Sequence, residues 1–225
     1  MPPGPPEPAP PPILRIITTN SSALFARLSA LQNNGRIPGD ASRYRHAMLG
    51  GNYRMTEFQA AILACQLKRL NAQTEHRFAN GKKLNASLAD IPGFIPLPDR
   101  DGETCNAYHL YCFSIDETYF GVAREHVLNA LRAEGVFCGP GYATLVYEHD
   151  AFTGGDFGPY TGASAGYTKS LALNRAKCPV SERVAHATGA WLPMTELMSD
   201  CHGVDQIIAA FAKVSRLRDS IASAG

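Results

Sequence analysis

Residues 50–63, with the sequence GGNYRMTEFQAAIL, join a glycine-containing loop to the start of a helix. Thr56 is a typical N-cap residue, and Glu57 places an acid in the first turn, where the helix dipole favours it. Such a junction offers backbone N–H groups and a positive dipole end, which suit an anion such as phosphate. Asn52 adds an amide donor and Arg54 a permanent positive charge. The residues alone leave an ordinary capped loop as the alternative to an anion site.

A long helical pattern follows from Glu57 to Ala89, and Pro92-Gly93 ends it. Such a helix would be roughly 50 Å long. A helix of that length usually joins two domains or breaks near its middle, and the polar run 71–76 is the expected break. Its apolar residues keep to one face: Phe58, Ala61, Ile62, Cys65, Leu67 and Leu70.

Upstream, the sequence predicts a tail, a strand and a short helix. Eight of the sixteen prolines fall within residues 1–12, which predicts a disordered polyproline-type tail. Five of the seven residues 13–19 are β-branched, which favours a strand. Turn and N-cap residues at 20–22 precede a predicted helix over 23–31, and Asn33-Asn34-Gly35 is typical of a left-handed helix end.

Beyond residue 90, predicted strands alternate with predicted helices, which favours an α/β fold with helices packed on a small sheet. A glycine-rich segment at 151–167 is expected to form a loop. The predicted strands are 108–115 and 136–138, and the predicted helices are 124–134, 178–191 and 204–221.

Composition excludes several classes of partner. The formal charge of +1 gives no strong positive field for nucleic acid or anionic lipid. No apolar run approaches the roughly 20 residues of a membrane-spanning helix, and the proline-rich start is not a secretory signal. The six cysteines include no C-x-x-C pair, so we expect reduced thiols in a cytoplasmic protein.

Two weaker patterns are not expected to carry chemistry. Residues 162–166 (GASAG) match the letters of a nucleophile elbow, but a glycine-rich loop precedes them where that motif needs a strand. Cys105 and His109 have no second ligand pair nearby, so we expect no metal site.

The 50–63 segment resembles the G-x-N-Y-R-M-T-E-x-Q-A-A-I motif of the DegT/StrS family of pyridoxal-phosphate aminotransferases. Nearly all of residues 13–217 take part in the resemblance. It implies the C-terminal region of a fold-type I aminotransferase, with a remnant of the large domain. Other segments that are similar to the family, in the same order along the chain, are 17–20, 31–36, 107–111, 130–136, 178–180 and 191–193.

The family aminates keto-sugars and keto-cyclitols, and the spelling of residues 52–57 is most similar to members that act on scyllo-inosose-type cyclitols. Family members are dimers in which each active site is completed by the partner subunit. The asparagine at the position of Asn52 reaches the phosphate of pyridoxal 5′-phosphate in the neighbouring subunit. The resemblance therefore implies that Asn52, with Arg54 beside it, binds cofactor, and that the chain forms a homodimer or associates with a chain that carries the cofactor domain.

One departure from the family bears on activity. The Schiff-base lysine of the family lies a short way upstream of the strand that matches 13–19, whereas this sequence has its proline tail there and its first lysine is Lys68. We therefore expect a truncated aminotransferase that has no catalytic residue of its own and is inactive alone. The alternative is a non-catalytic module that docks on an intact homologue or a partner chain.

The same reasoning predicts four regions. They are a disordered tail (1–12), a remnant of the large cofactor domain (13–56), a linking helix (57–89) and a small C-terminal α/β domain (90–225).

Overall fold

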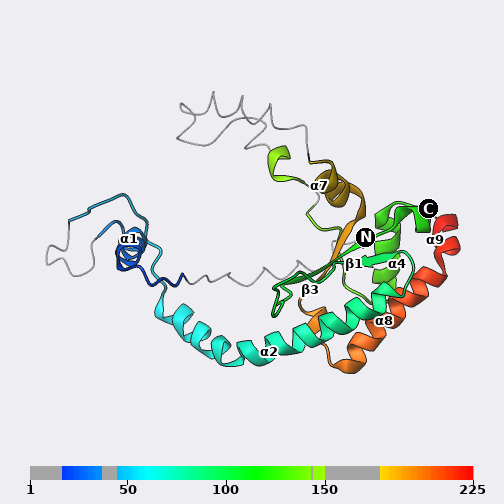
Figure 1. Cartoon of the computed structure of the whole chain (residues 1–225), viewed down its shortest axis with the longest axis horizontal. Helices are drawn as coiled ribbons and strands as arrows, with labels where there is room; N and C mark the ends of the chain where they lie inside the picture. The colour runs from blue at the N-terminus through cyan, green and yellow to red at the C-terminus, as the bar shows by residue number, and fades with distance from the viewer. Residues whose placement is uncertain (1–16, 37–44, 143, 150–177, 225) are drawn as a thin grey trace, which may run out of the picture. The chain divides into compact units, whose positions relative to one another are not determined.

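The computed structural model describes residues 17–36, 45–142, 144–149 and 178–224 (Figure 1). The chain divides into two compact units, Met1–Leu70 (unit 1) and Asn71–Gly225 (unit 2). The predicted tail, the 151–167 loop and the GASAG motif lie outside the described residues.

Unit 1 contains helix α1, Ser22–Gln32, where the sequence predicted one. Ser21 is the N-cap, and its hydroxyl accepts a hydrogen bond from the Leu24 N–H at 3.2 Å. The helix ends as predicted, with Asn34 (φ 56°) and Gly35 (φ 81°) in the left-handed region. The predicted strand over 13–19 is wrong in its described part, because residues 17–19 pair with no strand that the structure describes.

Helix α2, Glu57–Ala89, has the predicted bounds and spans the boundary between the units. The break expected at 71–76 is wrong, because the helix is continuous there. Polar side chains in and just after this run bind backbone carbonyls of unit 2 instead. His76 Nε2 lies 2.8 Å from the Ser199 carbonyl, and Arg77 Nε donates to the Ala107 carbonyl at 2.7 Å.

Unit 2 is built on an antiparallel sheet in the order β1-β2-β3: Phe94–Pro96, Leu110–Ile115 and Gly189–Pro193. Side chains of β2 alternate in burial, and one face of the sheet carries Tyr111, Phe113 and Ile115 into the core. Helices cover this face, so the predicted α/β class with helices on a small sheet is confirmed.

The helices contribute the other half of the core. Leu84 and Leu88 come from the second part of α2, and Phe211 lies 5.3 Å from Phe113 between ring centroids. The remaining elements are α3 (Glu117–Phe120), α4 (Arg124–Ala133), η1 (Val146–Glu148), α7 (Pro179–Arg183), the π-helical turn η3 (Val184–Thr188), η4 (Glu196–Met198), α8 (Cys201–Arg216) and α9 (Arg218–Ala224).

The helix predicted over 178–191 is wrong in its last three residues. Helical structure ends at Thr188, and residues 189–193 form β3 beside β2. Buried Arg124 fixes this change of direction by donating to the Ala185 carbonyl at 3.1 Å and the Gly189 carbonyl at 2.7 Å. This contact from a distant helix stabilises the end of the helix at Thr188, which the glycine at 189 also favours.

Two further predictions need correction. Residues 136–138 are not a strand, because none of them pairs with a described strand; a single bridge, between Gly139 and Trp191, follows the segment. The helix predicted over 204–221 is two helices, α8 and α9, and α8 starts at Cys201. The earlier start follows from Asp200, whose carboxylate accepts from the Gly203 N–H at 2.8 Å as an N-cap.

Candidate functional site

Asn52 and Arg54 lie together in the loop that leads into α2. Arg54 Nε donates to Asn52 Oδ1 at 2.9 Å, and both side chains are exposed. Because the amide oxygen is taken by Arg54, the Asn52 Nδ2 group is left to donate outward. The terminal nitrogens of Arg54 also bind no carboxylate in the described part of the chain. The two predicted site residues therefore form one donor site.

The backbone of this loop is held against the end of α1. The Gly51 N–H donates to the Leu31 carbonyl at 3.0 Å, and the Tyr53 N–H donates to the Gln32 carbonyl at 2.9 Å. A Cβ on Gly50 would lie 2.7 Å from the Leu31 carbonyl oxygen, so only glycine permits this approach. Gly50 and Gly51 therefore hold the backbone from which the Asn52 side chain projects against the end of α1.

Thr56 caps α2, and Gln59 completes a capping box. The Gln59 N–H donates to Thr56 Oγ1 at 3.3 Å, and the Thr56 N–H donates to Gln59 Oε1 at 2.9 Å. The role of Gln59 was not predicted, although the T-x-x-Q spacing is the signal for it. The box occupies the N–H groups of Thr56 and Gln59, and the side chains of Asn52 and Arg54 add further donors for an anion beside the helix start.

This donor set fits a phosphate group. Guanidinium and amide N–H groups are the usual protein donors to phosphate oxygens. The site does not supply an amine. Lys68 is the first lysine of the sequence, and it follows Glu57 on α2 by eleven residues, or about 16 Å along the helix axis.

The other described lysines are engaged in ion pairs within unit 2. They are Lys82 with Asp99, Lys83 with Asp205, and Lys213 with Glu134. The hydrogen bond that Lys82 donates to the Asp99 carboxylate raises the pKa of Lys82, which keeps this amine protonated and poorly nucleophilic. Lys169 and Lys177 lie outside the described residues.

The part of the chain that the structure describes has neither a metal-binding cluster nor a membrane-spanning helix. There, no three His, Cys, Asp or Glu side chains are grouped to hold a metal ion. No described helix is long and apolar enough to cross a membrane. The six cysteines are free thiols.

Comparison with known proteins gives a consistent result. The model of the DegT/DnrJ/EryC1/StrS aminotransferase family matches residues 16–212. A Streptomyces fradiae L-glutamine:2-deoxy-scyllo-inosose aminotransferase is 30% identical over 214 residues, which cover 89% of this chain and 49% of that protein. A Streptoalloteichus tenebrarius protein, provisionally named L-glutamine:3-amino-2,3-dideoxy-scyllo-inosose aminotransferase, is 33% identical over 199 residues, covering 87% of this chain and 47% of the relative.

Solved structures agree on the fold. A 3-amino-5-hydroxybenzoic acid synthase superposes with a TM-score of 0.66 at 23% identity, over 87% of this chain and 47% of that one. A DegT/DnrJ/EryC1/StrS aminotransferase from Brucella abortus gives a TM-score of 0.65 at 21% identity, over 87% of this chain and 44% of that one. This chain thus spans about half the length of the curated relatives it matches. From the match over residues 16–212, we conclude that the chain belongs to the DegT/DnrJ/EryC1/StrS aminotransferase family.

Proposed function

We propose that this chain takes part in the pyridoxal-phosphate-dependent amination of a keto-sugar or keto-cyclitol, and that Asn52 and Arg54 bind the cofactor phosphate across a subunit interface. The observation that carries the proposal is the 2.9 Å bond from Arg54 Nε to Asn52 Oδ1, within the segment that most resembles the family. When bound, the cofactor supplies the electron sink for amino-group transfer. The part of these two residues is to hold its phosphate and thereby fix its position.

The Schiff-base lysine is, in this proposal, supplied by residues outside these 225. Two facts support it. No lysine lies near Asn52 in the described part of unit 1, and Lys82, Lys83 and Lys213 are each paired with a carboxylate in unit 2. The relatives are about twice as long as this chain, so their remaining length is the expected source.

Partner association is part of the same proposal. Large apolar side chains of unit 1 are exposed, including Leu49 (96%), Phe58 (86%) and Ile62 (60%). Large apolar side chains left exposed favour an interface with another polypeptide. A second copy of the chain and a chain that carries the cofactor domain are the two candidates.

The phosphate site is tested by titrating the chain into pyridoxal 5′-phosphate and following the ³¹P resonance. We expect a saturable shift that inorganic phosphate reverses and pyridoxal, which lacks the phosphate, does not. Asn52→Asp keeps an acceptor for Arg54 but removes the Nδ2 donor and adds a negative charge. It should weaken binding about tenfold or more.

Asn71→Asp is the matched control, because Asn71 is an exposed residue of α2 and its substitution makes the same charge change. Equal binding by wild type and Asn52→Asp would refute the phosphate role. Borohydride reduction tests the lysine separately: we expect no lysine adduct from these 225 residues alone. A specific adduct at any lysine would overturn that part of the proposal and leave the phosphate site standing.

A further inference from the structure

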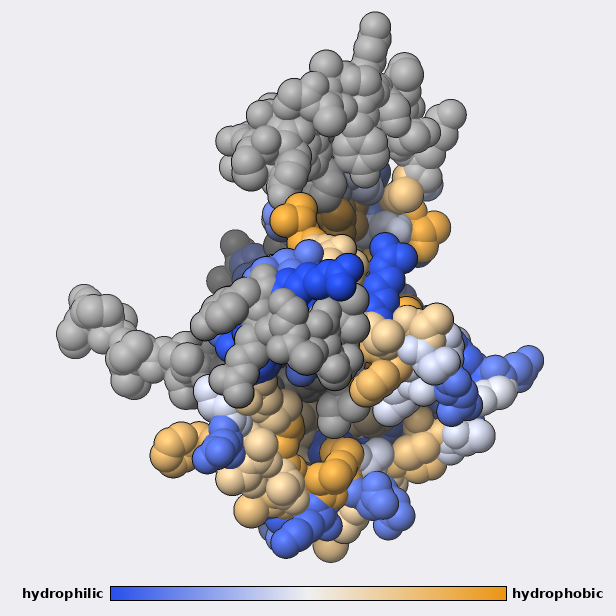
Figure 2. Space-filling view, turned by 90° about the vertical axis from the view of Figure 1, so that its left-hand side faces the viewer, coloured by the Kyte–Doolittle hydropathy of each residue, from blue (hydrophilic) through white to orange (hydrophobic). Residues whose placement is uncertain are grey.

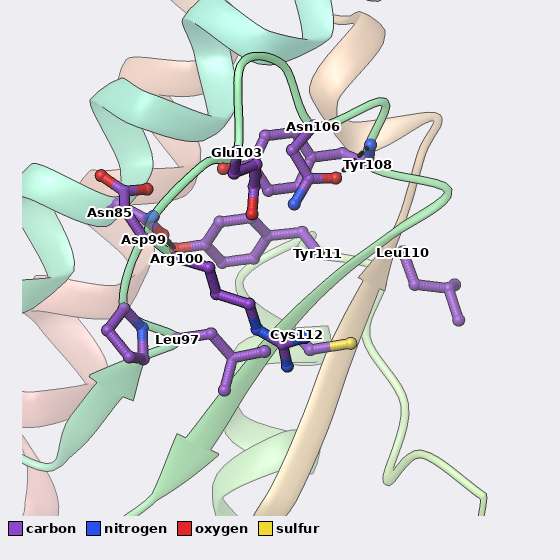
Figure 3. A pocket seen from close by; sticks show the side chains of 11 residues that line it. Asn85, Leu97, Asp99, Arg100, Glu103, Asn106, Tyr108, Leu110, Tyr111 and Cys112 are labelled. Atoms are coloured by element: carbon purple, nitrogen blue, oxygen red, sulfur yellow. Dashed lines mark hydrogen bonds between the residues drawn. The ribbon is translucent and has the colours of Figure 1, made fainter.

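Unit 2 contains a pocket of about 270 Å³ that the aminotransferase proposal does not use (Figure 3). It lies between the segment 97–106 and strand β2, and α2 contributes Asn85 to its wall. In Figure 3, Asn85, Asn106 and Arg100 lie around the ring of Tyr111. Polar groups thus converge on one small cavity, which is typical of a ligand site.

The Asn85 amide is held in a fixed orientation. The hydroxyl of Tyr111 donates to Asn85 Oδ1 at 2.6 Å, and Tyr111 is only 1% exposed. With its oxygen taken by this buried phenol, Asn85 has its Nδ2 group left to donate. The described residues offer that group no acceptor, so a ligand oxygen would complete it.

Asn106 repeats the arrangement from the other side. Its Oδ1 accepts from the Tyr108 N–H at 2.9 Å, which again leaves an amide N–H₂ group to donate. Tyr108 itself adopts φ 44°, an unusual conformation for a residue that is not glycine. The Tyr108 ring packs closely against α2 at Gly81, where an added Cβ would lie 2.5 Å from the ring. This packing holds the strained turn in place.

Charge at the rim is balanced. Lys82 pairs with Asp99, and the remaining charges, Arg100 and Glu103, are of opposite sign. Four formal charges therefore cancel, which favours a neutral ligand over a phosphate or a carboxylate. Leu97 and Leu110 also line the pocket, and they add apolar surface to it.

We propose that this pocket binds a neutral polyhydroxylated six-membered ring, either a cyclitol or a hexopyranose. Fixed amide donors match ring hydroxyl oxygens, apolar contacts match the C–H faces of the ring, and the cavity is small enough to favour a single ring. The inference rests on the chemistry of the pocket and does not depend on the phosphate site in unit 1.

Saturation-transfer NMR on the full chain tests the proposal, with myo-inositol and glucose as the two ring probes. Mannitol serves as an open-chain comparison and inositol monophosphate as a charged one. We expect saturable binding of at least one ring probe, and weaker binding of mannitol and of the phosphate ester. The probe that binds more tightly identifies the ring class.

Two isosteric variants test the assigned groups. In Asn85→Asp and Asn106→Asp the carboxylates still accept from Tyr111 and from the Tyr108 N–H, so the fold is retained while the donors are lost. Each should weaken ring binding about three- to tenfold. Asn52→Asp, in unit 1, should leave ring binding unchanged, which separates this site from the phosphate site.

The proposal is overturned if no ring probe binds saturably, or if both aspartate variants bind as wild type does. Tighter binding of inositol monophosphate than of myo-inositol would also contradict it, because the ligand would then be an anion. Circular dichroism of each variant confirms that the comparison is between folded chains.

Discussion

Helix α2 passes from one environment to another along a single continuous stretch of chain. In its first part, within unit 1, Phe58 is 86% and Leu67 is 64% exposed, whereas Leu84 and Leu88 in its second part are fully buried in unit 2. The first part is the more apolar in sequence, with nine of residues 57–70 apolar against seven of residues 71–89. An amphipathic pattern therefore predicts that a face needs burial, but not that the partner surface lies in the same chain.

The same contrast holds beyond the helix. The core cluster of described residues extends from Leu84 to Val214 and belongs to unit 2. In the described part of unit 1, Ala30 is the one apolar residue that is buried. Figure 2 shows hydrophobic surface, in orange, open on the face that it draws. Unit 2 thus has a buried apolar core, whereas the large apolar side chains described in unit 1 are mostly exposed.

The strongest test of this contrast substitutes one phenylalanine in each unit. Phe211→Ala removes a fully buried ring from unit 2 and should lower the free energy of unfolding by about 3–5 kcal/mol. Phe58→Ala removes an exposed ring and should change it by less than about 0.5 kcal/mol. Urea unfolding followed by the fluorescence of Trp191, the single tryptophan, measures both. A large loss for Phe58→Ala in this transition would show that unit 1 unfolds together with unit 2, because Trp191 lies in unit 2.

A buried arginine allows a second comparison. Arg124 donates to carbonyl groups at the end of the π-helical turn, so Arg124→Met leaves these acceptors unpaired. We expect a loss of about 1–3 kcal/mol in the free energy of unfolding. Arg54→Met, at the exposed site of unit 1, is the matched control and should leave stability unchanged while weakening phosphate binding. Equal stability losses would place Arg54 in a folded core.

Local signals in the sequence were sufficient for the helices with clear ends. Thr56 at the start and Pro92-Gly93 at the end set the bounds of α2, and Ser21 set the start of α1. Strand β3 could not be predicted in this way, because its register comes from pairing with β2 and its start depends on Arg124, which lies 65 residues before Gly189. Non-local contacts overrode local preference there.

In the candidate site, too, local sequence predicts some features, and non-local contacts set the others. Residue type and motif were enough to single out Asn52 and Arg54, but not the hydrogen bond that orients the Asn52 amide. The sequence did not predict the two amides in the pocket of unit 2. Asn85 and Asn106 come from different elements, and their orientation depends on hydrogen bonds to Tyr111 and Tyr108.

Helix caps sharpen the comparison at a smaller scale. Thr56→Ala removes the cap of α2 in unit 1, and Asp200→Ala removes the cap of α8 in unit 2. Each cap is worth about 1 kcal/mol locally. We expect Asp200→Ala to lower the free energy of global unfolding by about that amount. Thr56→Ala should instead accelerate amide exchange at the start of α2 about fivefold, without changing the unfolding of unit 2.

Amide hydrogen exchange, read residue by residue, distinguishes the two outcomes. Were Thr56→Ala to lower the midpoint of the Trp191 unfolding transition as much as Asp200→Ala does, the two units would unfold as one. The two parts of α2 would then differ in the exposure of their side chains, but not in their free energy of unfolding.

The smallest expected effect concerns acid and lies within unit 2. Glu148 Oε2 accepts from the Leu145 N–H at 2.8 Å, and Oε1 lies 3.0 Å from His186 Nε2. The backbone bond above all, and then the bond to His186, lower the pKa of Glu148 below its ordinary value. A lowered pKa means that the native state favours the carboxylate. The stabilisation is therefore present above the ordinary glutamate pKa of about 4.3 and is lost as pH falls through the lower native value.

We accordingly expect the Glu148 carboxyl to titrate at a lower pH than a free glutamate, measured by its ¹³C shift. Glu148→Gln should remove this part of the acid dependence of unfolding, because an amide does not titrate. Glu134→Gln, which loses a carboxylate paired with Lys213 instead, should keep it. A Glu148 midpoint at or above the free value would mean that the contact between η1 and the π-helical turn gives unit 2 no stability at neutral pH. Unit 2 would then rest on its apolar core and on the hydrogen bonds of Arg77 and Arg124.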